Sequence, residues 1–250
     1  MTLTNYAGTE FSLRIDRKVE LLSADQMEAR LGVSLGESIR AVAFASTNDL
    51  TNLGDAAWAE NGGTVCMWIL GMFRPSPQGL VVVPYREGDA AELGPIATTD
   101  YFGEVPSDRI RIDEGKIIFK ADGKHRSKIG VSALRAKNVA GSYDPDQEML
   151  TIIQYSMPDS PAQYVNQLWE IQEKPFEGDV VNSYNDGPLA DGSQMGPFYE
   201  LESCSPAAFL NPGEHLTHTH ATYHFIGKKA ELDPVSQQVL GVAIDEIVLK

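Results

Sequence analysis

Four histidines lie within ten residues near the end of the chain, and imidazole is the side chain that most readily gains or loses a proton near neutral pH. They are His215, His218, His220 and His224. Alternate side chains of a strand share a face, so His218, His220 and His224 would point to one side and the apolar residues between them to the other. Such a row predicts a metal site at these three histidines, because neutral imidazole binds zinc, iron or nickel. The same row would equally suit a polar cleft lined by hydrogen-bonded histidines.

Two acids stand just upstream of the histidines. Glu200 and Glu202 are two residues apart, so a strand places both carboxylates on one face. Carboxylates this close repel each other, which raises the pKa of one and prepares it for general acid or base work. The alternative is a buried ion pair with an arginine such as Arg74, Arg86 or Arg126.

Several aromatic residues flank the same region. Trp68, Trp169, Tyr184 and Tyr199 would offer faces for a sugar ring to stack on, although aromatic residues more often fill a core. A turn is expected at Asn185 and Asp186, which are followed by glycine and proline. The candidate ligand-binding residues are Trp169, Asn185, Asp186, Tyr199 and His224.

Short strands must position these residues. Alternating or continuous apolar runs predict strands over residues 11–22, 42–46, 80–85, 149–155 and 217–225. The nine-residue apolar run 65–73 predicts a buried strand, whereas residues 48–54 are rich in turn formers.

Two helices are expected beside the strands. Ser23 is a suitable N-cap and Gly32 a suitable stop for a short helix between them. A closing helix fits the C-terminal end, with Pro234 at its start. Many strands and few helices predict an all-β sandwich or barrel, formed by residues 1–250 as one domain.

Charge narrows the classes of partner. The chain carries a formal net charge of −15, which argues against nucleic acid or an anionic membrane surface as a partner. Its two cysteines, Cys66 and Cys204, have no zinc or disulfide spacing and are expected as buried free thiols. The N-terminus lacks the basic and apolar regions of a signal peptide, which favours the cytoplasm. No nucleophile elbow, phosphate-binding loop or dinucleotide fingerprint occurs in the sequence.

Longer runs of the sequence resemble a known family. These are FSLRIDRKVELL, WILGMF, DYFGEVPSDR, ADGKHRSKIG, GDVVNSYNDGP and the segment from GPFYELES to the final histidines. Together they cover nearly the whole chain and resemble an uncharacterised bacterial domain-of-unknown-function family. That resemblance implies a galactose-mutarotase-like β-supersandwich. It also implies a further N-terminal section before the strand at Phe11, which this sequence does not show.

A more distant resemblance concerns the site. Aldose epimerases carry their catalytic base on a Leu-Glu-Thr type strand, followed by a Pro-Gly-Glu turn and a final strand. Here Leu201-Glu202-Ser203, Pro212-Gly213-Glu214 and Tyr223-His224-Phe225 follow in that order. The resemblance therefore implies that Glu202 is the base. It also implies that a histidine from an earlier strand acts as the general acid. The only earlier histidine here is His125, which lies outside any epimerase-like motif.

Three functions follow as hypotheses. The first is a sugar epimerase or glycan-processing enzyme, with Glu202 as base and His218, His220 or His224 as acid. The second is a non-catalytic carbohydrate-binding module that uses the same cleft and no cofactor. The third is a metal-dependent, cupin-like enzyme, because the spacing from Gly213 to His224 approaches the first cupin motif. In that case His218, His220 and His224 would hold a divalent metal.

Overall fold

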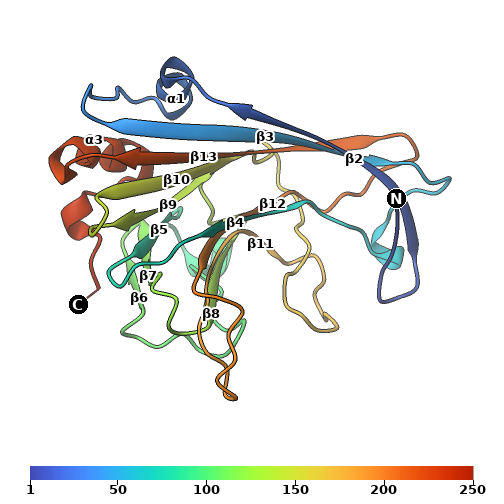
Figure 1. Cartoon of the computed structure of the whole chain (residues 1–250). Coiled ribbons are helices and arrows are strands. Elements are labelled where there is room, and N and C mark those ends of the chain that lie inside the picture. Colours follow the sequence, from blue (N-terminus) through green and yellow to red (C-terminus); the bar gives the residue numbers. More distant parts are fainter. Residues whose placement is uncertain (250) are drawn as a thin grey trace.

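Two antiparallel β-sheets pack face to face in the computed structural model, which describes residues 1–249 (Figure 1). The large sheet has the strand order β1-β2-β3-β13-β10-β9-β5-β7-β6. Its strands are β1 (Thr2–Thr4), β2 (Glu10–Leu21), β3 (Arg40–Asn52), β5 (Leu80–Pro84), β6 (Ile110–Asp113), β7 (Lys116–Lys120), β9 (Val139–Asp144), β10 (Met149–Tyr155) and β13 (His215–Ile226). The small sheet has the order β4-β12-β11-β8, and its strands are β4 (Trp68–Phe73), β8 (Ser127–Ser132), β11 (Asp179–Asn185) and β12 (Tyr199–Cys204). The predicted all-β sandwich is confirmed.

Within residues 1–249, three α-helices and two short 3-10 helices accompany the sheets. They are α1 (Ala24–Leu31), α2 (Ala90–Leu93), α3 (Lys229–Leu240), η1 (Glu60–Gly62) and η2 (Ile244–Glu246). Helices α1 and α3 lie at the same end of the large sheet (Figure 1). The predicted cap of α1 is confirmed: Ser23 Oγ accepts from the amide of Gln26, whose side chain accepts from the Ser23 amide. Among residues 1–249, no helix is long and apolar enough to cross a membrane.

In the middle of the large sheet both faces are buried, as strand β10 shows. Leu150 and Ile152 pack into a core shared with α1 and α3, whereas Ile153 and Tyr155 pack into a second core between the sheets. The two-residue period of the strand therefore sends alternate apolar side chains to two different cores. The small sheet packs one of its own faces against the large sheet. The opposite face of the small sheet points away from the large sheet and can carry a site.

Some predicted elements differ from the observed ones. Residues 48–52 continue β3 and pair with β13, because the hydrogen-bond ladder outweighs their turn propensity. Pro234 lies inside α3, since the helix already begins at Lys229, where the Glu231 side chain accepts from the Lys228 amide. The apolar run 65–73 yields an edge strand from Trp68, and Trp68 and Met72 are exposed rather than buried.

Candidate functional site

The outer face of the small sheet, on the side away from the large sheet, carries a cluster of ionisable residues. On β12, Ser203 points toward the large sheet, so the alternating Glu200 and Glu202 point outward. Strand β11 lies on one side of β12 and places Asn182 directly opposite Glu202. Strand β8 follows β11 and contributes Lys128. We call Lys128, Asn182, Glu200 and Glu202 the carboxylate face.

Glu202 is the centre of this face and is fully buried. Its Oε2 accepts from Lys128 Nζ at 2.8 Å and from Trp68 Nε1 at 2.8 Å. The Lys128 ammonium group also lies over the ring of Trp68, 5.5 Å from its centroid. A buried carboxylate with a cation and a second donor is stabilised in its ionised form. Of the two readings of the acids, the ion pair therefore exists, but its cation is a lysine rather than one of the three arginines.

The environment of Glu200, in contrast, favours the protonated form of its carboxyl group. Burial and the adjacent carboxylate of Glu202 raise the pKa of Glu200 to about 8. At neutral pH Glu200 therefore keeps its proton, while Glu202 beside it is paired with a cation. Two carboxyl groups whose surroundings separate their protonation states are suited to act as acid and base on one ligand.

Two acceptor oxygens on this face lack hydrogen-bond partners within residues 1–249. They are Glu202 Oε1 and Asn182 Oδ1, and both are buried. Asn182 Nδ2 donates to the Tyr101 hydroxyl at 3.1 Å, and that hydroxyl donates to Asp179 Oδ2 at 2.6 Å. Gly130 makes room for this arrangement, because a Cβ atom there would lie 2.1 Å from Asp179 Oδ2. Unpartnered acceptors of this kind fit a ligand that brings donors.

The histidines lie on the other side of β12, between the two sheets. Ser203 Oγ is 2.9 Å from His218 Nε2 and 2.8 Å from His220 Nδ1, so one hydroxyl bridges two imidazoles. His224 Nδ1 is 2.9 Å from Thr151 Oγ1. The predicted alternation along β13 is observed, with Tyr223 packed toward the helices. The structure does not, however, bring the histidines together with Glu202, because the small sheet separates them.

Burial keeps these histidines neutral. It lowers the pKa of His218 to about 4 and that of His220 to about 3, and it lowers the pKa of His224 as well. No three His, Cys, Asp or Glu side chains within residues 1–249 are arranged to hold a metal ion. His220 Nε2 is buried without a partner in the same part of the chain. A metal at His218, His220 and His224 stays a prediction from the sequence.

The other predicted ligand-binding residues are dispersed. Tyr199 Oη lies 2.7 Å from Ser142 Oγ in the core between the sheets. Asn185 binds the loop at Gly123 and His125, and Asp186 accepts from the Tyr184 hydroxyl at 2.8 Å. These three residues hold loops and strands together.

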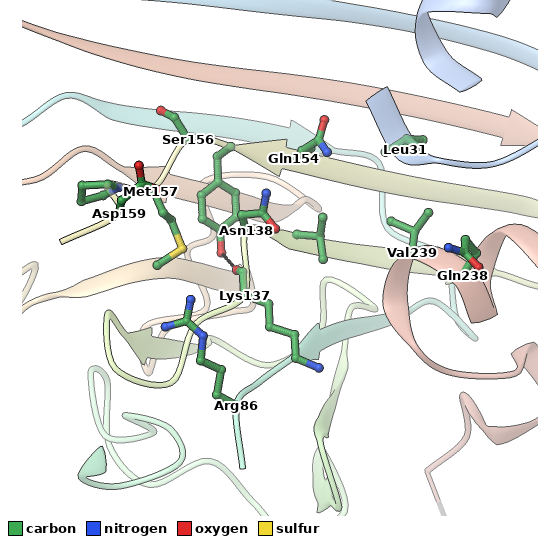
Figure 2. Close-up of a pocket in the computed structure, with 13 residues that line it drawn as sticks. Leu31, Arg86, Lys137, Asn138, Gln154, Ser156, Met157, Asp159, Gln238 and Val239 are labelled. Carbon is green, nitrogen blue, oxygen red and sulfur yellow. Dashed lines mark hydrogen bonds between the residues drawn. The ribbon is translucent and has the colours of Figure 1, made fainter. Parts of the chain in front are cut away.

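Trp169 alone is open to solvent among the predicted ligand-binding residues, with 82% of its surface exposed. It lines a groove of about 700 Å³ with Tyr6 and Phe176. A further pocket of about 720 Å³ lies at the end of β10, where Arg86, Lys137 and Ser156 line it (Figure 2). Neither hollow is lined by Glu200 or Glu202.

Lys128, Asn182, Tyr101 and Asp179 were not among the residues predicted from the sequence. Only Lys128 could have been found from the sequence. It lies in the mainly apolar run of residues 127–132, and a buried lysine needs a partner for its charge. Its partner Glu202 is 74 residues away in the chain, so spacing does not reveal the pair.

Comparison with solved structures gives distant similarities. A candidate aldose 1-epimerase from Escherichia coli K12 is 14% identical, with a TM-score of 0.44 over 77% of this chain and 67% of that one. The Slr1438 protein from Synechocystis sp. PCC 6803 is 10% identical, with a TM-score of 0.46 over 90% of this chain and 73% of that one. No curated protein matches the sequence.

One family model matches the sequence from end to end. It covers residues 1–250 and describes a family of unknown function. This agrees with the family resemblance carried by the sequence motifs. The chain is thus a member of the DUF6786 family of unknown function.

Proposed function

We propose that the carboxylate face binds a carbohydrate and transfers protons on it, with Glu202 as base and Glu200 as acid. The observation that carries this proposal is a pair of neighbouring carboxyl groups on one strand face, of which Glu202 is paired with a cation and Glu200 is not. Lys128 and Trp68 stabilise the ionised form of Glu202, and burial keeps the proton on Glu200. Epimerisation or ring opening of a sugar needs one group to take a proton and another to give one.

A polyhydroxyl ligand is favoured by the acceptors that have no partner. Glu202 Oε1 and Asn182 Oδ1 are cross-strand neighbours and would each accept from a hydroxyl group of the ligand. Trp68, a residue that is 43% exposed at the edge of the same sheet, offers an aromatic side chain beside them. The order of the Leu-Glu-Ser strand and the Pro-Gly-Glu turn, which resembles that of aldose epimerases, supports the same ligand class.

Glu200 replaces the histidines in the role of acid. His218 and His220 point into the space between the sheets, and their lowered pKa values leave them as neutral imidazoles at neutral pH, which are much weaker acids than imidazolium. Glu200 lies on the same face of the same strand as Glu202. Its pKa is raised to about 8, so it keeps its proton at neutral pH. It is the better donor on both grounds.

The test is turnover of a panel of aldoses and their anomers, followed by NMR or polarimetry. Glu202→Gln should lower turnover by about a hundredfold or more, as the loss of a general base does. Glu200→Gln should lower it as well and should remove the limb of the pH profile near pH 8. Glu177→Gln, which changes an exposed carboxylate, is the matched control and should leave turnover unchanged. Full turnover by Glu202→Gln would contradict the proposal.

A non-catalytic carbohydrate-binding module is the second candidate. It is favoured by the commitment of Glu202 Oε2 to Lys128 and Trp68, which leaves only one oxygen of that carboxylate for a ligand. Calorimetry separates the two candidates. Sugar binding that survives Glu202→Gln, with no turnover by the unchanged protein, would establish the module.

A further inference from the structure

The Glu202 carboxylate lies on an outer sheet face and yet is closed off from solvent. Its cover is aromatic. Lys128 Nζ, which pairs with Glu202, lies 5.5 Å from the ring centroid of Trp68 and 5.2 Å from that of Tyr101. Trp68 belongs to strand β4 and is held in a hydrogen-bond ladder, whereas Tyr101 belongs to a loop. Any ligand of Glu202 has to pass this cover.

The loop is tied to the sheet through two side chains. The Tyr101 hydroxyl donates to Asp179 Oδ2 at 2.6 Å and accepts from Asn182 Nδ2 at 3.1 Å. The ring of Phe102 lies 3.9 Å from the guanidinium carbon of Arg126. It also meets the ring of Tyr184 edge to face. These contacts are local and can be broken without disturbing a strand.

The backbone of the same loop is fastened only at its ends. Thr98 exchanges two hydrogen bonds with Gly130 of β8, both 2.9 Å, and Val105 is buried in the core between the sheets. Between these points the backbone bonds that the structure describes stay within the segment, from Gly103 to Asp100 and from Val105 to Thr99. Gly103 has a φ of +91°, a conformation that suits glycine and allows a sharp bend.

We propose that residues 99–104 form a lid over the carboxylate face, and that the lid opens by release of Tyr101 and Phe102 while Thr98 and Val105 stay in place. Opening uncovers Glu202 Oε1 and Asn182 Oδ1, the two acceptors without partners. The structure is the closed state. The inference rests on the proposed function in one respect, namely that Glu202 is the group a ligand must reach.

The test measures access to Glu202 directly, with a water-soluble carbodiimide and glycine ethyl ester as the probe. The carbodiimide adds to the Glu202 carboxyl to give an O-acylisourea, and an amine then displaces the urea to form an amide. The amine is either that of glycine ethyl ester or that of Lys128, and peptide mass spectrometry detects both products. Tyr101→Phe removes the hydroxyl that binds Asp179, and Arg126→Gln removes the cation over Phe102. Each variant should raise the modification rate of Glu202 severalfold over the unchanged protein.

Two matched controls define the expected result. Tyr6→Phe makes the same chemical change at a tyrosine that is 86% exposed and should leave the Glu202 rate unchanged. Glu177, an exposed carboxylate, should react at the same rate in every variant, which shows that the reagent acts equally on each sample. Equal Glu202 rates in Tyr101→Phe, Arg126→Gln and the unchanged protein would overturn the lid. A rate that rises only in Trp68→Phe would overturn it too, because the cover would then open at the edge strand.

The labelling result is independent of turnover, so the two proposals fail separately. Faster labelling in the lid variants, combined with unchanged turnover by Glu202→Gln, would leave the lid standing and reject the catalytic role. Loss of turnover in Glu202→Gln, combined with unchanged labelling, would leave the catalytic role standing and reject the lid.

Discussion

Buried ionisable residues of opposite character lie on the two sides of strand β12. On the outer side, Glu202 is paired with Lys128, and burial beside it raises the pKa of Glu200 to about 8. On the inner side, His218 and His220 are neutral and share the hydroxyl of Ser203. The difference shows that burial alone does not set the protonation state. A buried cation preserves charge on one side, and its absence removes charge on the other.

The two sides should respond to pH with opposite sign. The pKa values of His218 and His220 are lowered by folding, so below about pH 6.5 the unfolded chain binds protons that the folded chain refuses, and stability falls as the pH falls. The pKa of Glu200 is raised by folding, so stability from this group is present at low pH and is lost as the pH rises through about 8.

The largest expected effect comes from breaking the charge pair on the outer side. Lys128→Met should lower the free energy of unfolding by about 3–5 kcal/mol, because it leaves the buried Glu202 carboxylate without its cation. Lys18→Met is the matched control, since Lys18 pairs with Glu20 on the surface and should contribute about 1 kcal/mol or less. Denaturant unfolding of both variants measures the difference. Equal losses would mean that Glu202 is not a buried charge.

The inner side should be less sensitive because its groups are neutral. Ser203→Ala should cost about 1–3 kcal/mol, since it leaves His218 Nε2 and His220 Nδ1 without their shared partner. Ser193→Ala at an exposed loop should change stability by about 0.5 kcal/mol or less. Thermal unfolding of the pair tests this, and a loss at Ser203 as large as that at Lys128 would erase the contrast between the two sides.

The smallest expected effect is the change in the free energy of unfolding per pH unit. Between about pH 6 and pH 4, each neutral histidine should make stability fall by about 1.4 kcal/mol per pH unit as the pH decreases. His220→Gln should reduce that slope by one such contribution. Chemical denaturation at several pH values provides the slopes. An unchanged slope in the variant would show that His220 takes up its proton in the folded state as readily as in the unfolded chain.

The bounds of individual strands and helices were predicted from the sequence better than the layers that pack against them. Strand β10 has the predicted bounds of 149–155, and α1 begins after the predicted cap at Ser23, because both signals are local. The alternation of the histidines was also correct, but the period of a strand does not state which layer covers each face. Here Tyr223 packs under the helices and His218 under the small sheet, so both faces of β13 are interior.

The site was predicted in part for the same physical reason. Glu200 and Glu202 share a face by local spacing, and that was visible in the sequence. Their partners Lys128, Asn182 and Tyr101 arrive through the order of strands in the small sheet and through one loop crossing. Such non-local contacts depend on topology, which spacing along a single strand does not encode.

The difference in protonation between Glu200 and Glu202 is the central claim, and an isotope-edited titration tests it most directly. Carbon-13 at the side-chain carboxyl of glutamate gives each group its own chemical shift, and Glu200→Gln and Glu202→Gln assign the two signals. We predict a Glu200 signal that stays protonated at neutral pH and titrates near pH 8. Two signals that are both ionised at pH 7 would contradict it.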